Sequence, residues 1–314
     1  MRRKWLIHRL WLKQIRLLQR ISLPGFKGMN LYEVLRFFYL GLTDSKFTLM
    51  ASAMSYQFFF SLFPTLLLML IVLPRVPIPH LKENVIGFIQ EVVPPEGLLF
   101  VETIVQKQFE RPTNVWLLIL STLLALWGAL RGIIATMKAF TKNEEVFKKR
   151  NWLEMYRLAL TLFMAISGIV LAAVVIQLAF EGFSGLLADA GLMGYSVRMI
   201  LSRSLLVLIY VSTLFLVITT IYHLAPATDQ RWKMFSPGAV IATLLTILAI
   251  YGLRVYFAQF GQFNQIYGSL GAIILLMVWF YYISMVLLIG FELNAAIDIA
   301  SYHKRQQPGS AQPE

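Results

Sequence analysis

The sequence contains no cysteine, few histidines and few charges for a chain of 314 residues. Without cysteine there are no disulfides and no thiolate metal sites, although this absence assigns no compartment. Only 14% of the residues are charged, a smaller share than a soluble domain uses. The histidines show no metal-ligand spacing, and they are His8, His80, His223 and His303. We therefore expect no metal centre and no soluble domain.

Apolar residues dominate the chain, at 58% of the sequence, and the mean hydropathy is +0.68. An α-helix needs about 20 apolar residues to cross the hydrocarbon core of a bilayer. Six runs of this kind occur, so the sequence predicts an all-α integral membrane protein with a bundle of six transmembrane helices. The runs are Leu49–Leu73, Val115–Met137, Tyr156–Phe180, Ser204–Tyr222, Pro237–Phe257 and Leu270–Ala296.

Lysine and arginine alternate between the connections of these six helices. The N-terminal segment, alternate connections and the C-terminal tail together hold 19 of them, and the opposite set of connections holds six. Cytoplasmic loops carry the excess of positive charge in membrane proteins. Both termini are therefore predicted to face the cytoplasm, as an even number of crossings requires.

The tryptophans give a second indication, because this residue favours the headgroup level of a bilayer. Trp116, Trp152 and Trp232 each stand at a predicted helix end. Trp127 and Trp279 lie in the middle of predicted helices. We interpret these two as packing residues rather than as a stacking site.

Residues 1–48 form a basic segment before the membrane domain. Its first 22 residues carry seven lysines or arginines, five of which cluster on one helical stripe, and this pattern predicts an amphipathic helix on the anionic cytoplasmic leaflet. A partly disordered basic tail is the alternative. "SLPGFKG" ends this helix, and Asn30 with Glu33 resembles a capping box that starts the next one.

The membrane domain is predicted to span residues 49–297. Its one long external segment, residues 74–114, contains six prolines between which two short helices are expected. Residues 298–314 are predicted to form a disordered cytoplasmic tail.

Five stretches of the chain resemble a known family over about residues 32–300. They are "ASAMSYQFFFSLFPTLLLML", "LWGALRGIIATMKAF", "IYHLAP", "RWKMFSPGAV" and "QIYGSLGAIILLMVWFYYISMVLLIGFELNAAI". The combination of YGSLGA with GFELNA is similar to the YihY/BrkB family of bacterial inner-membrane proteins, in which GAELNA is more frequent, so Phe291 departs from the pattern. The resemblance implies six helices in the bacterial cytoplasmic membrane, a virulence-factor label, the old label ribonuclease BN, and no agreed activity.

Residues for enzymatic chemistry are missing from the sequence. A nuclease needs a metal cluster or paired acid and base groups, and the loops hold no closely spaced carboxylates beyond Glu144 and Glu145. The glycines of the second helix lack the lysine and hydroxyl residue of a nucleotide-binding loop. The net charge of +12 is explained by topology and anionic lipid. We therefore expect no enzyme, no cofactor and no nucleic-acid partner.

Two pairs of glycines are predicted to let helices approach closely. Gly128 and Gly132 form a GxxxG pattern, and Gly268 with Gly271 lies in the YGSLGA motif. Such pairs also occur by chance. A homo-oligomer built on such a face is left open by the sequence.

Polar residues inside the apolar runs are the candidate functional residues, because a charge at mid-helix costs about 2.5–3.5 kcal/mol and faces the bundle interior. Each has a structural alternative: Arg254 can snorkel, Gln57 can bond a neighbouring helix and Asn294 can cap a helix end. Together they predict a polar groove that an amphiphile can enter. The candidates are Tyr56, Gln57, Ser61, Arg131, Arg254, Tyr267, Glu292 and Asn294.

These residues favour a transporter or flippase of an anionic lipid or another amphiphile. Arginines near both membrane faces suit an anionic headgroup, whereas a metal cation would require more carboxylates in the span. The expected partners are membrane lipids with anionic headgroups at the cytoplasmic face. The alternative is a non-transporting scaffold for cell-envelope assembly that recruits partners through the basic N-terminal segment.

Arg131 and Glu292 are predicted to share a cavity on the cytoplasmic side. At about 1.5 Å per residue, each lies about 10 Å from the cytoplasmic end of its helix, and small residues flank both. A buried cation requires a partner, so we expect the two to pair directly or through water. Separate snorkelling of the two side chains is the alternative.

Reporter fusions along the chain test the predicted topology. The expected locations alternate from outside to inside, starting outside, and a cytoplasmic signal at the third position would show that one helix does not cross. The fusion points, in order, are after Arg111, Arg150, Arg198, Arg231, Gln262 and Lys304.

Overall fold

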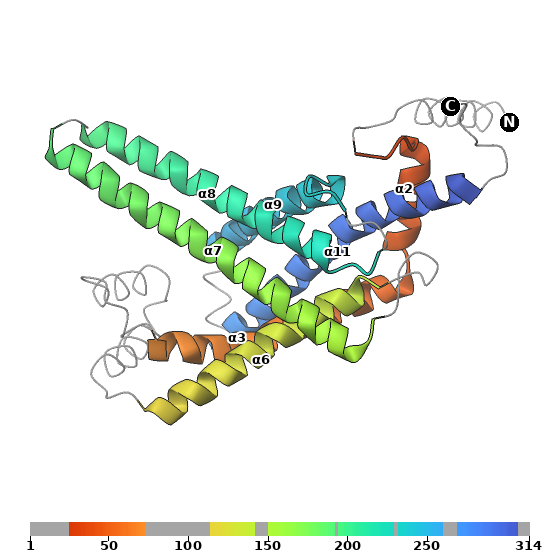
Figure 1. The fold of residues 1–314 in the computed structure, drawn as a ribbon, viewed down its shortest axis with the longest axis horizontal. Coiled ribbons are helices and arrows are strands. Elements are labelled where there is room, and N and C mark those ends of the chain that lie inside the picture. Colours follow the sequence, from red (N-terminus) through yellow and green to blue (C-terminus); the bar gives the residue numbers. More distant parts are fainter. Residues whose placement is uncertain are drawn as a thin grey trace. The chain divides into compact units, whose positions relative to one another are not determined.

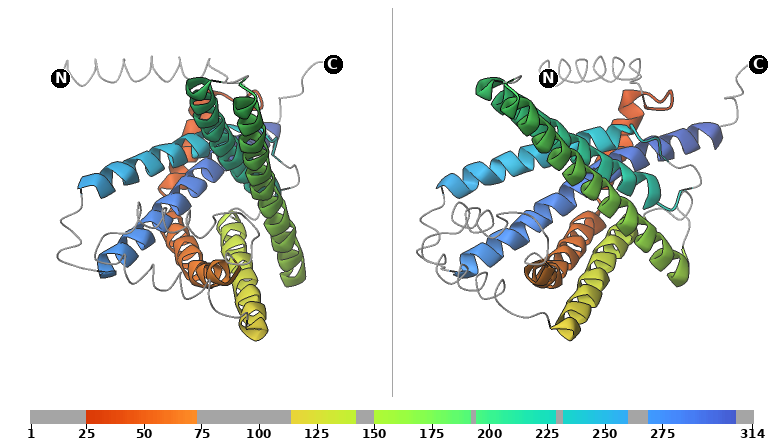
Figure 2. Two further views of the ribbon diagram at one scale, coloured as in Figure 1. Left: turned by 90° about the vertical axis from the view of Figure 1, so that its left-hand side faces the viewer. Right: turned by 60° about the vertical axis from the view of Figure 1, so that its left-hand side comes forward.

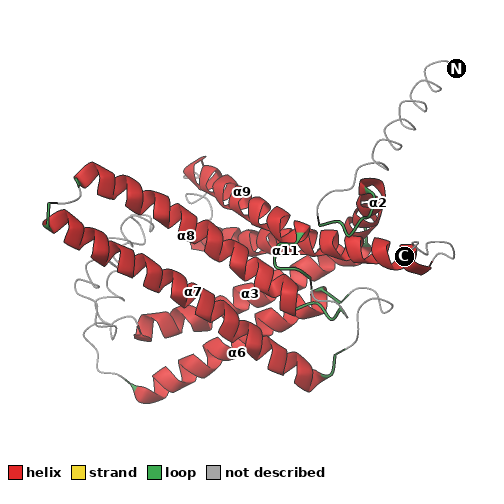
Figure 3. Ribbon diagram, turned by 45° about the horizontal axis from the view of Figure 1, so that its top comes forward, coloured by secondary structure: helices red, strands yellow, loops and turns green. Residues whose placement is uncertain are grey.

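The structure is a computed structural model that describes residues 25–72, 114–141, 150–191, 194–228, 232–259 and 269–306. The predicted basic helix and almost all of the external segment lie outside these residues. The part described contains seven helices and no strand (Figure 3), which confirms the all-α class. The helices are α2 (Leu31–Leu42), α3 (Ser45–Val72), α6 (Val115–Ala139), α7 (Trp152–Asp189), α8 (Tyr195–Leu224), α9 (Pro237–Gln259) and α11 (Ser269–Gln306).

Five of these helices are long and apolar enough to cross a membrane: α3, α6, α7, α8 and α11. Each coincides with one of the predicted runs. The remaining run forms α9, in which the apolar stretch Pro237–Leu253 is shorter. Five candidate crossings are thus shown, and the sixth crossing and the orientation stay predictions.

The chain divides into two compact units. The smaller unit is Tyr56–Gly132, which holds most of α3 and α6. The larger unit comprises the chain up to Ser55 and from Ile133 onwards, with α2, α7, α8, α9 and α11.

In the larger unit, α7 and α8 run antiparallel and pack against each other (Figures 1 and 2). Asn151 is the N-cap of α7, and its backbone N–H donates to Glu154 Oε2 over 3.4 Å. Gly191 follows the end of α7 with a φ of 71°, a left-handed conformation that favours glycine after a helix. The local sequence therefore fixes both ends of α7.

Arg150 closes the C-terminal end of α8, where helical carbonyls lack intrahelical donors. Its Nη1 donates to the carbonyl of Ala225 over 2.6 Å, and its Nη2 donates to the carbonyl of Pro226 over 2.9 Å. A cation also interacts favourably with the negative end of the helix dipole. The connection before α7 is thereby tied to the end of α8.

The start of α9 packs directly against α11. A Cβ atom on Gly238 would overlap the carbonyl oxygen of Gly290, so the two helix backbones touch at this point. Asn294 completes the contact, because its Oδ1 accepts from Gly238 N–H and its Nδ2 donates to Ser236 Oγ, both over 2.9 Å. Pro237 occupies the first turn of α9, where its missing N–H costs nothing.

Four aromatic side chains fill the space beside this crossing. Phe291 stacks on Phe140 with ring centroids 4.4 Å apart and planes 6° from parallel. Trp232 lies 5.6 Å from Phe291, and the Tyr222 hydroxyl donates to the Leu287 carbonyl over 2.7 Å. Phe291, the departure from the family pattern, is therefore a core residue.

The place of Trp232 at a predicted helix end suggested an exposed position at the membrane interface. The structure instead buries this side chain. It is 5% exposed, and its Nε1 donates to Asp298 Oδ2 over 2.5 Å. Trp116 and Trp152 are 81% and 72% exposed at the starts of α6 and α7. Tertiary packing therefore determines whether Trp232 is buried, and the local sequence pattern does not predict this burial.

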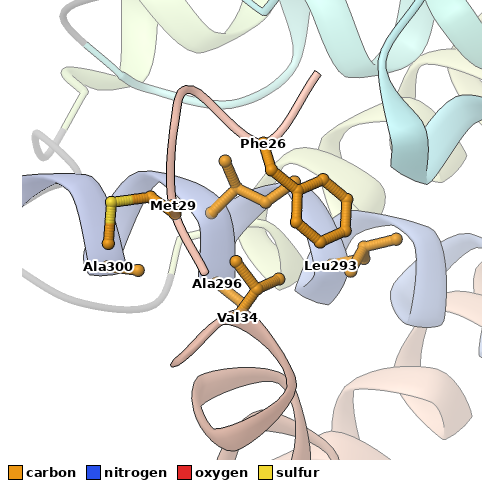
Figure 4. Close-up of a cluster of buried hydrophobic side chains, with 7 residues drawn as sticks. Phe26, Met29, Val34, Leu293, Ala296 and Ala300 are labelled. Atoms are coloured by element: carbon orange, nitrogen blue, oxygen red, sulfur yellow. The ribbon is translucent and has the colours of Figure 1, made fainter. Parts of the chain in front are cut away.

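The turn before α2 is part of the core. Phe26 and Met29 are buried with Val34 against the side of α11 (Figure 4). Lys27 Nζ pairs with Asp298 Oδ1 over 2.6 Å. Helix α2 begins at Leu31 as predicted, with Asn30 as the N-cap, but the Asn30 side chain makes no capping hydrogen bond.

Helix α11 continues to Gln306, beyond residue 297, where the membrane domain was predicted to end. Ile297 and Ala300 are buried in the cluster of the α2 turn, and Asp298 bonds Lys27 and Trp232. Because both faces of this last segment have partners, it is ordered as helix. Residues 307–314 of the predicted tail lie outside the part described.

Substitution of Gly290 by alanine tests the crossing of α9 and α11. The new Cβ would come within 2.6 Å of the Gly238 carbonyl oxygen and 2.8 Å of Ala242 Cβ. We expect Gly290→Ala to lose about 1–3 kcal/mol of stability through overpacking, measured as a lower unfolding temperature in detergent. Gly168→Ala on α7 is the matched control, because nothing lies within 4 Å of its Cβ position. Equal unfolding temperatures for the two variants would contradict the contact.

Candidate functional site

A groove of about 560 Å³ lies between α3 and α6. All of its lining residues belong to the smaller unit. Four of the predicted candidates, Tyr56, Gln57, Ser61 and Arg131, meet in it. The lining is Tyr56, Gln57, Phe60, Ser61, Phe63, Pro64, Leu124, Trp127, Gly128 and Arg131.

Two glycines on α6 allow the backbones of α3 and α6 to approach closely at the groove. A Cβ on Gly128 would lie 3.1 Å from the Cα of Ser61, and one on Gly132 would lie 3.1 Å from Cδ1 of Phe58. The later glycine on α6 thus faces the earlier residue on α3, so the helices are antiparallel. Small residues hold the backbones close, as is usual between membrane helices.

The groove is polar at one end and apolar at the other. In this antiparallel pair, Gly132 on α6 lies at the level of Phe58 on α3. One end of the groove is therefore lined by Arg131 from α6 and by Tyr56 and Gln57 from α3. The other end is lined by Phe63, Pro64 and Leu124. Along α6, seven residues separate Leu124 from Arg131, which is about 10 Å. The groove therefore has the polarity of an amphiphile.

Arg131 supplies the cationic group of the polar end. Its guanidinium carbon lies 5.2 Å from the ring centroid of Trp127, one helical turn earlier, which is a cation–π contact. Arg131 is exposed, and Trp127 is 53% exposed. Among the lining residues there is no aspartate or glutamate. The charge in the groove is therefore positive.

Trp127 is the lining residue that sequence reasoning assigned to packing. Its place four residues before Arg131 puts both side chains on one helical face, which was the available signal. The spacing alone did not distinguish an aromatic under a cation from an aromatic in a packed interface. Phe60 and Phe63, likewise, were not among the candidates.

Pro64 removes one backbone hydrogen-bond donor from the interior of α3. It has no N–H, so it donates nothing to the carbonyl of Phe60, four residues earlier. Helix α3 continues through Pro64. The hydroxyl of Ser61 donates to the Phe58 carbonyl over 2.9 Å, and its Oγ can still accept a hydrogen bond.

The remaining candidates lie elsewhere. Glu292 is 6% exposed on α11, and Asn294 is 4% exposed and holds the start of α9, the structural alternative that the sequence left open. Arg254 lies on α9 and Gly271 near the start of α11. Tyr267 and Gly268 are outside the described residues. Over the described ranges, no group of three or more acidic or histidine side chains could hold a metal ion.

Arg131 and Glu292 fall in different compact units. The predicted pairing of these two side chains therefore stays a prediction.

Comparison with known proteins places the chain in a family. It is 28% identical to the ribonuclease-like protein YfkH of Bacillus subtilis (strain 168) over 82% of this chain and 90% of that protein. UPF0761 membrane proteins of Tolumonas auensis and Vibrio cholerae are 38% identical, each over 26% of its own length. No solved structure matches the chain. The sequence profile of the family described as "Virulence factor BrkB" matches residues 38–314, and the chain belongs to this family of bacterial multi-pass membrane proteins.

Proposed function

We propose that this protein transports or flips an anionic lipid or a similar amphiphile across the bacterial cytoplasmic membrane. The groove between α3 and α6 carries the proposal, because a cationic end and an apolar end lie along one continuous surface. An amphiphile places its headgroup beside Arg131 and its chain beside Phe63 and Leu124. The proposal includes six crossings with both termini in the cytoplasm.

The position of the groove along α6 favours loading from the cytoplasmic leaflet. Arg131 lies seven residues before Lys138, which is about 10 Å from the predicted cytoplasmic end of the helix. Leu124 is as far again toward the middle of the bilayer. A lipid of the inner leaflet has its headgroup and chain in this order. The groove therefore fits a lipid that enters without turning over.

The charge of the groove favours an anion over a metal cation as the substrate. Hard cations require several oxygen ligands, usually with carboxylates among them, and the lining residues include none. A guanidinium, by contrast, binds phosphate through paired hydrogen bonds. We also propose that the chain is not an enzyme, in keeping with the absence of paired catalytic groups from its sequence.

Substitution of Arg131 tests the proposed transport. In proteoliposomes that contain a fluorescent phosphatidylglycerol, the native protein is expected to accelerate exchange between leaflets. Arg131→Ala should slow this exchange about tenfold, because a charge-assisted hydrogen bond contributes about 1.5–3 kcal/mol. The rate is measured from the fraction of probe that an external quencher reaches with time.

The matched control is Arg157→Ala, which removes an exposed arginine of α7 outside the groove. This variant should exchange lipid at the native rate. No acceleration by the native protein, or the same rate for Arg131→Ala and the native protein, would contradict the proposal.

The alternative function is a scaffold that recruits envelope-assembly partners through its basic N-terminal segment. Deletion of residues 1–24 separates the two functions. The deletion stops there because Phe26 and Met29 are buried against α11. A transporter should keep most of its lipid exchange without this segment, and the same assay measures it. Loss of function in cells with unchanged lipid exchange in vesicles would favour the scaffold.

A further inference from the structure

We infer that the groove selects a lipid whose headgroup carries a phosphodiester and no ammonium group, as phosphatidylglycerol does, and that Trp127 positions Arg131 to bind it. This inference rests on the proposed function and adds the headgroup class and a positioning residue. It has three supports, namely the geometry of the cation, the charge of the lining and the order of polarity along the groove.

The contact between Arg131 and Trp127 orders the cation. A guanidinium over an indole ring uses its planar face in the contact and keeps the N–H groups at its edges for other partners. Since Trp127 and Arg131 are one turn apart, the contact forms within one helix. Phosphate oxygens accept from paired edge N–H groups. Trp127 thereby reduces the ordering that binding has to impose on a long side chain.

The lining discriminates between anionic and zwitterionic headgroups. Phosphatidylethanolamine brings an ammonium group a few ångströms from its phosphate. No carboxylate lines the groove to receive this ammonium, and Arg131 repels it. Gln57 and Tyr56 at the same end offer an amide and a hydroxyl, which can hydrogen-bond the hydroxyl groups of a glycerol headgroup. The polar end thus complements phosphatidylglycerol.

The apolar end of the groove favours a lipid over a soluble phosphate compound as the ligand. Phe63, Pro64 and Leu124 line it about 10 Å along the helix from Arg131. These side chains offer no hydrogen bond to a soluble ligand. They match the part of a lipid chain that follows the headgroup. Glycerol phosphate should therefore bind far more weakly than a lipid with the same headgroup.

Binding by the purified full-length protein tests the headgroup class. Short-chain phosphatidylglycerol and phosphatidylethanolamine with identical chains are titrated by calorimetry, with glycerol phosphate as a third ligand. We expect phosphatidylglycerol to bind at least about tenfold more tightly than either of the others. Equal affinity for the two lipids would overturn the headgroup class. Glycerol phosphate binding as tightly as the lipid would overturn the lipid assignment.

Four variants test the positioning role. Arg131→Lys keeps the charge but loses the planar fork, and Trp127→Ala removes the ring, so both should lower the preference for phosphatidylglycerol about tenfold. Trp127→Phe keeps an aromatic face and should restore most of the preference. Arg157→Lys should leave it unchanged. Unfolding temperatures verify that each variant is folded. If Trp127→Ala is folded and keeps the native preference, the positioning role is wrong.

The two proposals fail separately in these assays. Lipid exchange that depends on Arg131, without any headgroup preference in binding, would overturn the inference and leave the transport function standing. A headgroup preference that depends on Arg131, with no acceleration of lipid exchange, would overturn transport and leave the binding site standing.

Discussion

The backbone contact between Gly238 and Gly290 is the constraint on which the larger unit depends. Any side chain at either position would separate α9 from α11. The contact brings Gly238 N–H within reach of Asn294, and the space beside Gly290 admits the hydroxyl of Tyr222, whose hydrogen bond to Leu287 joins α8 to α11. Three helices are therefore held at one level by the absence of two side chains. Between membrane helices, such close packing and hydrogen bonding take over the role that the hydrophobic effect has in water.

In the smaller unit, a glycine also lets two helix backbones approach closely, and here the approach is accompanied by a groove. Gly128 lies against Ser61, so the backbones of α3 and α6 approach at that level. Large side chains flank the glycine on its own helix and on the opposite one, with Trp127 and Phe60 in the lining. The two backbones are close at Gly128, and the large side chains beside it project outward on both helices. The space between these side chains is the groove. The small residue therefore shapes the site as well as packing the helices.

Hydropathy and helical spacing predicted much of this arrangement, because both depend on local sequence. Gln57, Ser61 and Pro64 recur at helical spacing on α3 with Tyr56 beside them, and so their meeting in one groove could be expected. Contacts between distant segments could not be foreseen. The partner of Asn294 is 56 residues away, and buried Trp232 donates its hydrogen bond to Asp298, 66 residues away. For such residues, the local sequence does not specify the partner, and tertiary packing determines it.

The arginine within the apolar run of α6 is the feature that structural roles account for least. A charge at mid-helix costs about 2.5–3.5 kcal/mol in a membrane, and the cation–π contact with Trp127 offsets about 0.5–2 kcal/mol of this. Packing of α6 against α3 does not require this arginine, since Gly128 and Gly132 already provide the close approach. A purely structural role would therefore leave the free-energy cost of the charge uncompensated. A phosphate group in the groove would supply the missing compensation, because it would bring a negative charge to an exposed cation. The charge would then stabilise the complex with a ligand and not the empty protein, as is expected of a residue kept for binding.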